Sequence, residues 1–111
     1  MHRLDMEHRL VKVPARLRST VDDAVASGLF MDVSDLAIHM MRELLLAEPS
    51  TARAAYVSFG PVPAMEDTFA VTLRIPRGMV REAGERGYGL ARLAAAGIAL
   101  YGERHSGERQ D

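Results

Sequence analysis

The chain has 111 residues, which is enough for one compact domain or for two very small units. Hydrophobic residues make up 48% of the sequence and cysteine is absent, which excludes an intrinsically disordered chain, a disulfide framework and a thiolate metal site. The formal net charge of −1 excludes a general attraction to nucleic acid, although residues 70–102 hold five arginines against two glutamates.

The first half of the sequence reads as one strand followed by two helices. The stretch HRLVKVP, from His8, is typical of a strand that ends at Pro14, because proline has no N–H to donate to a neighbouring strand. The next stretch, ARLRSTVDDAVASG, places its apolar side chains on one helical face and stops at Gly28. A second helical pattern, SDLAIHMMRELLLAE, starts at Ser34, a favourable N-cap residue. We therefore expect residues 1–48 to form a strand–helix–helix unit.

Two segments show no sustained period. Residues 49–68 contain three prolines and a glycine, which predicts a linker with one short extended piece at AYVSF. Residues 104–111, RHSGERQD, are polar and terminal, which predicts a flexible tail. The linker reaches up to about 66 Å when fully extended, so its length allows the segments on either side of it to pack together.

The order of elements repeats after the linker. The stretch FAVTLRIP alternates apolar with other residues and ends at Pro76, and two helical patterns follow, RGMVREAGERG and YGLARLAAAGIALYGE. The stretch TLRIPRGM at 72–79 matches LVKVPARL at 10–17 in its order of cation, branched residue and proline. Because one strand cannot form a sheet alone, we expect residues 69–103 to be a second unit whose strand pairs with the first.

The first unit resembles the ribbon–helix–helix (Arc- and MetJ-like) family of DNA-binding proteins. The resemblance rests on VKVPARL at the junction of strand and helix, on Gly28, and on SDLAIHMMRELL in the second helix. The second unit resembles a shortened copy, because Gly87 follows Pro76 by 11 positions whereas Gly28 follows Pro14 by 14. The resemblance implies a mainly α fold with a two-stranded antiparallel β-ribbon, in which tandem units form an intramolecular pseudo-dimer.

The resemblance also implies that the outward face of the ribbon reads DNA bases in the major groove. Side chains alternate between the two faces of a strand, so Val11, Val13, Val71, Leu73 and Ile75 are expected to pack inward. The predicted base-reading residues are His8, Leu10, Lys12, Ala70, Thr72 and Arg74. Lysine or arginine suits guanine, threonine bonds several base edges, and apolar side chains suit the thymine methyl group. The competing reading is that outward cations are solvated and protect a strand edge, and an exposed Leu10 equally marks a protein contact.

The start of the second helix in each unit is the predicted contact with DNA phosphates. Free N–H groups and the helix dipole favour an anion there, and the family uses this helix start to hold the DNA backbone. The predicted phosphate-contacting residues are Val33, Ser34, Arg86 and Arg92. Asp32 and Asp35 oppose such a contact, and Ser34 equally serves as a plain N-cap.

These features predict a sequence-specific DNA-binding transcriptional regulator, a cytoplasmic and nucleoid-associated repressor without enzymatic activity or cofactor. No set of His, Asp and Glu residues has the spacing of a metal site, no apolar run is long enough for a membrane span, and the first ten residues are too charged for a secretory signal. The expected partners are double-stranded DNA and further copies of the whole chain. The alternative is an antitoxin-type protein whose first unit dimerises and whose second half binds a toxin protein, and an interaction scaffold that has lost DNA binding is a third reading.

Overall fold

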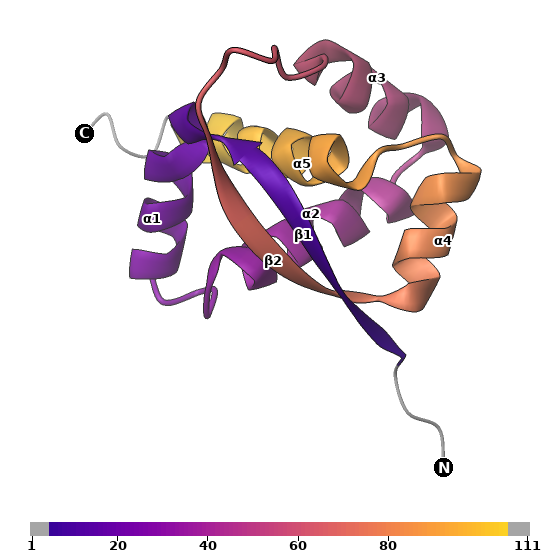
Figure 1. The fold of residues 1–111 in the computed structure, drawn as a ribbon, viewed down its shortest axis with the longest axis horizontal. Coiled ribbons are helices and arrows are strands. Elements are labelled where there is room, and N and C mark those ends of the chain that lie inside the picture. Colours follow the sequence, from indigo (N-terminus) through magenta and orange to yellow (C-terminus); the bar gives the residue numbers. More distant parts are fainter. Residues whose placement is uncertain (1–4, 107–111) are drawn as a thin grey trace.

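The structure, a computed structural model, describes residues 5–106 (Figure 1). Within these residues it has five α-helices and one two-stranded antiparallel sheet, so the coarse prediction of a mainly helical fold with an antiparallel ribbon is confirmed. The elements in chain order are β1 (Met6–Pro14), the 3-10 helix η1 (Ala15–Leu17), α1 (Arg18–Ala26), α2 (Val33–Leu46), α3 (Pro49–Phe59), β2 (Thr68–Pro76), α4 (Arg77–Glu85) and α5 (Leu90–His105).

The two strands pair with each other within the chain over nine positions. Leu10 lies opposite Thr72 at the centre, with Lys12 opposite Ala70 on one side of this pair. Pro14 and Pro76, which end the two strands, each lie four positions from the central pair, so the register is symmetric about this pair. The two strands are therefore centred on the same pair, and each is followed in the chain by two helices, with α3 inserted before β2.

Equivalent hydrogen bonds close the two ends of the ribbon. The N–H of Ala15 donates to the carbonyl oxygen of Asp67 at 2.8 Å, and the N–H of Arg77 donates to the carbonyl oxygen of Asp5 at 2.7 Å. In each case the first residue after one strand bonds to the residue just before the other strand. Each segment thus satisfies a backbone group of the other at one end of the ribbon.

The helices lie on one side of the ribbon, and the core fills the space between them. In Figure 1 the ribbon crosses in front of α2, and α1 and α4 flank it on opposite sides. The inward positions predicted from the alternation are all buried, which confirms the assignment of the strand faces (Val11, Val13, Val71, Leu73 and Ile75). They pack with the buried faces of α2 and α5 into one hydrophobic core.

The prediction of a linker over 49–68 is wrong, because Pro49–Phe59 form the helix α3. Pro49 occupies the first helical turn, where the missing N–H costs nothing, and Gly60 ends the helix with a φ of 76°. Ala52 and Tyr56 are buried, one turn apart on the face of α3 that packs toward α5. The segment is therefore a fifth helix added to the two strand–helix–helix segments.

The remaining boundaries differ from expectation by a few residues. β1 begins at Met6 rather than His8, and β2 begins at Thr68, inside the expected linker. The predicted flexible tail over 104–111 is wrong at its start, since α5 continues to His105, while the part from 107 onward lies outside the described residues. The polar composition of this segment predicts that the helix ends before residue 104. In the structure Arg104 belongs to α5 and forms an ion pair with Glu43 of α2.

Candidate nucleic-acid interface

The outward face of the ribbon presents the six predicted base-reading side chains to solvent. All six are exposed, and Leu10, at the centre, has 69% of its surface accessible (His8, Leu10, Lys12, Ala70, Thr72 and Arg74). The alternation of the strands explains this arrangement, because every second residue must point away from the helices. The six residues therefore lie together on the outward face of the ribbon, as the alternation in the sequence predicted.

Lys12 and Arg74 lie on different strands, on opposite sides of the central pair. Arg74 is opposite His8, so its level on the ribbon is four positions along β1 from that of Lys12. At roughly 3.4 Å per residue, the two cations are roughly 14 Å apart along the ribbon, which corresponds to the rise of about four base pairs. The face therefore carries one cation toward each end and a Leu10–Thr72 pair between them.

The two cations have different surroundings. A guanidinium nitrogen of Arg74 lies 3.8 Å from a carboxylate oxygen of Asp32, and both side chains are about half exposed. No ion pair joins Lys12 to another residue in the part of the chain that the structure describes. Because solvent screens an exposed pair, the Asp32 carboxylate reduces the charge of Arg74 only in part.

The start of α2 is capped by carboxylates, and the expectation that Ser34 is the N-cap is wrong. Asp32 is the N-cap, with its Oδ1 accepting the N–H of Asp35 at 2.9 Å. In return, Oδ2 of Asp35 accepts the N–H of Met31 at 2.8 Å. This reciprocal pair uses amide donors at the helix start and places two negative charges there, which opposes the binding of a phosphate.

Ser34 instead joins α2 to the ribbon, a role that the sequence did not indicate. Its side chain is almost fully buried, with 6% exposed, and its Oγ accepts the backbone N–H of Arg74 at 3.0 Å. That N–H lies on the edge of β2 that faces away from β1, so the hydroxyl takes the place of a neighbouring strand. Val33 next to it is half-buried, and neither residue presents a free side-chain donor to solvent.

The start of α5 is covered by α3. The hydroxyl of Tyr56 accepts the N–H of Gly89 at 3.0 Å, and the Tyr56 ring packs against Tyr88 with 4.7 Å between centroids. Arg92 donates from two nitrogens to the carbonyl oxygen of Tyr56, at 3.0 and 3.2 Å, and its guanidinium lies over the same ring. Arg92, expected at a phosphate, therefore caps the C-terminal turn of α3.

Arg86 is also engaged inside the protein. Its Nε lies 2.8 Å from a carboxylate oxygen of Glu82, and its carbonyl oxygen accepts a bond from the guanidinium of Arg53 at 3.0 Å. Arg53 in turn lies over the ring of Tyr88. Sequence reasoning missed Arg53 and Tyr56, which lie in the segment interpreted as a linker. The positive charges of this flank remain, but the side chain of Arg92 is held by α3 and that of Arg86 by Glu82 of α4.

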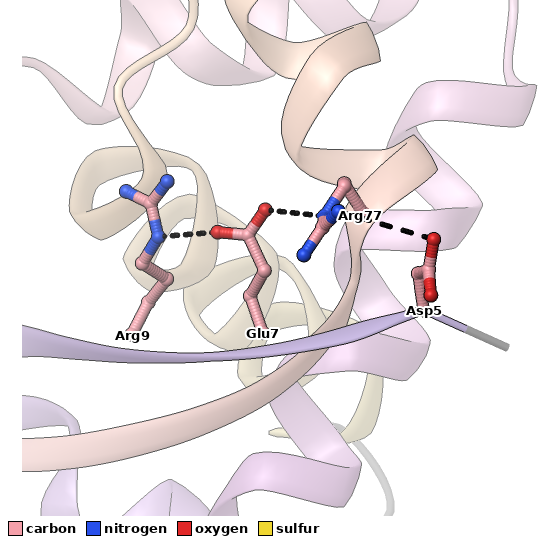
Figure 2. A network of polar contacts seen from close by, with 4 residues as sticks. All are labelled: Asp5, Glu7, Arg9 and Arg77. Carbon is pink, nitrogen blue, oxygen red and sulfur yellow. Dashed lines mark hydrogen bonds and ion pairs between the residues drawn. The ribbon is translucent and has the colours of Figure 1, made fainter.

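A four-residue charge network closes the end of the ribbon at the start of β1 (Figure 2). The carboxylate of Glu7 lies between the guanidinium groups of Arg9 and Arg77, at 2.8 and 3.2 Å, and Arg77 also pairs with Asp5 at 3.9 Å. The hydrogen bond from Arg9, together with the charges of both arginines, outweighs desolvation and lowers the pKa of Glu7. The network links β1 to the first turn of α4 and was not foreseen from the sequence.

The described residues contain no group of three His, Cys, Asp or Glu side chains placed to hold a metal ion. None of their helices is both long enough and apolar enough to cross a membrane. Comparison of the chain with protein-family models, with curated proteins and with solved structures found no match.

Proposed function

We propose that this protein is a sequence-specific DNA-binding regulator with a tandem ribbon–helix–helix fold, which reads the major groove with the ribbon of one chain. The observation that carries the proposal is the outward face of the ribbon, where Lys12 and Arg74 flank the exposed Leu10–Thr72 pair. The opposite face of the same ribbon is buried against helices, so the outward face is the one free to enter a groove.

The chemistry of this face matches the edges of base pairs. The major groove of B-DNA is about 12 Å wide and admits a two-stranded β-ribbon. Lys12 and Arg74 suit the acceptors of guanine, Thr72 bonds to several edges, and Leu10 and Ala70 suit the methyl group of thymine. The spacing of the two cations then corresponds to guanines about four base pairs apart.

The two flanks of the ribbon differ in charge, so we expect phosphate contacts mainly on one of them. Near the start of α2, Asp32 and Asp35 repel phosphates, whereas the other flank carries four arginines with two glutamates, Glu82 and Glu85 (Arg53, Arg81, Arg86 and Arg92). Since phosphate contacts supply much of the affinity of such proteins, one DNA strand is held more tightly than the other. The proposed recognition site is accordingly asymmetric and not palindromic, because site symmetry follows protein symmetry.

The antitoxin-type alternative requires the first unit to pair with a second copy of itself. In the structure β1 pairs with β2 of the same chain over its whole length, which favours the tandem arrangement instead. The proposed regulator acts as a repressor by occupying a site that polymerase needs. In this proposal the protein is cytoplasmic and associated with the nucleoid, and further copies of the whole chain bind neighbouring sites on the DNA.

The proposal is tested by binding a fluorescent duplex, selected from random DNA, to single-residue variants. We expect Lys12→Ala and Arg74→Ala each to weaken binding by about 1–3 kcal/mol, which is the range for a bidentate contact to a base, and to relax the sequence preference. Arg42→Ala is the matched control, because Arg42 is an exposed cation on α2 outside the ribbon face. If all three variants bind as tightly as the parent protein, the ribbon face does not read DNA.

A further inference from the structure

α2 and α5 approach each other so closely at Gly97 that no side chain fits there. A Cβ added at Gly97 would lie 2.8 Å from the Cβ of Met40 and 3.4 Å from its carbonyl carbon. The first of these distances is shorter than real Cβ contacts, and one of the neighbours is backbone. Glycine is unfavourable inside a helix, so its place in the middle of α5 is explained by this contact.

Met40 and Gly97 occupy equivalent positions in the two units. In α2 the buried pairs Leu36-Ala37 and Met40-Met41 are spaced like Leu93-Ala94 and Gly97-Ile98 in α5. A position of one helix therefore meets its own counterpart in the other. The Cβ and the backbone of Met40 take up the space that a side chain at position 97 would need.

A difference in side-chain size extends along both helices. The buried face of α2 is built mainly from large residues, whereas Ala94, Ala95 and Ala96 precede Gly97 in α5. A second glycine of α5, Gly102, also lies close to the first unit. A Cβ added there would lie 3.0 Å from Oγ1 of Thr20 in α1. Both glycines of α5 therefore accept side chains of the first unit.

We infer that the contact of Met40 with Gly97 is a recognition device, which selects pairing of the two unlike units and rejects pairing of like units from two chains. If two α2 helices crossed in this way, the Cβ atoms of two Met40 residues would lie closer together than real Cβ atoms do, as a Cβ at position 97 would lie 2.8 Å from that of Met40. If two α5 helices crossed, two glycines would leave a void. The partner that fits the first unit is accordingly the small-residue helix of the second unit, and a second copy of the first unit is excluded.

The first experiment exchanges the two residues in the full chain. Gly97→Met and Met40→Gly are each expected to lower the midpoint of thermal unfolding. The double variant, Met40→Gly with Gly97→Met, has the same composition as the parent and again places methionine against glycine, so it should recover most of the loss. If the losses of the single variants simply add in the double variant, the size match is not what joins the helices.

The second experiment reports which strands pair, and it does not depend on DNA binding. The sequence has no cysteine, so Leu10→Cys introduces a unique thiol at the centre of the ribbon. When two β1 strands pair in the same register, this thiol faces its copy and forms a disulfide between chains. The Leu10→Cys protein is refolded from denaturant under oxidising conditions, and the covalent dimer is measured on a non-reducing gel.

Met40→Gly is added to this background, because it removes the Cβ that would lie too close to its copy when two first units pair. Met41→Gly is the matched control, because Met41 is buried next to Met40 in the same helix and the change carries the same helix cost. We expect several-fold more covalent dimer with Met40→Gly than with Met41→Gly, and little dimer without either change. Equal dimer yields from the two variants would overturn the inference, even if the ribbon binds DNA as proposed.

Discussion

Ser34→Ala tests how the ribbon is attached to the helices. The substitution removes the hydroxyl that accepts the N–H of Arg74 at 3.0 Å, in a position where only 6% of the residue is exposed. This hydrogen bond is partly buried, and a donor that loses its acceptor away from water costs about 1–3 kcal/mol. Alanine is a better helix former than serine by roughly half a kcal/mol, which offsets part of this cost. We therefore expect a net loss of about 1–2 kcal/mol in the free energy of unfolding.

For a domain of this size, a loss of that magnitude lowers the midpoint of thermal unfolding by about 4–8 °C. The assay is thermal unfolding followed by circular dichroism, with Ser58→Ala as the control. Ser58 is exposed in α3, so the same chemical change there should leave stability equal or slightly raised. If Ser34→Ala unfolds at the same temperature as Ser58→Ala, the bond from Arg74 to Ser34 does not hold the ribbon on α2.

Two further predictions concern charges beside the ribbon. The arginines around Glu7 lower its pKa, so its contribution to stability is full above the ordinary value of 4.5 and is lost as the pH falls through the lowered pKa. The unfolding midpoint of the parent should therefore fall more steeply on acidification than that of Glu7→Gln, and parallel curves would contradict this. Asp32→Asn keeps an N-cap residue but removes the charge that lies 3.8 Å from Arg74. Asp32→Asn should tighten binding to the selected duplex by up to about fivefold. An unchanged affinity would mean that the Asp32 carboxylate does not weaken the contact of Arg74 with DNA.

The faces of the strands could be predicted from the sequence because alternation is a local property. Val11, Leu73 and their neighbours must lie on one side of the chain wherever the strand packs, so the outward set follows at once. The repeat of cation, branched residue and proline predicted that the two strands pair, but not whether they pair within one chain or between two chains. The structure adds that they pair within one chain, with Leu10 and Thr72 at the centre.

The phosphate-contacting residues could not be predicted, because their surroundings depend on a helix that the sequence concealed. Pro49 looked like a helix breaker, although at the first helical turn it is compatible with a helix. With α3 missing from the prediction, Tyr56 was not available as a partner, and Arg92 was assigned to DNA. The N-cap was misplaced by two residues because both Asp32 and Ser34 are suitable, and only the burial of Ser34 under the ribbon decides between them.

The measurement that tests the account most directly is selection of binding sites from random duplex DNA by the full chain, with Lys12→Ala selected in parallel. The account predicts one enriched, short and non-palindromic sequence bound by a single chain, with the preference lost at one position in the Lys12→Ala selection. Failure to enrich any sequence would contradict DNA reading by the ribbon. A strict palindrome bound by two chains through paired β1 strands would contradict the single-chain ribbon.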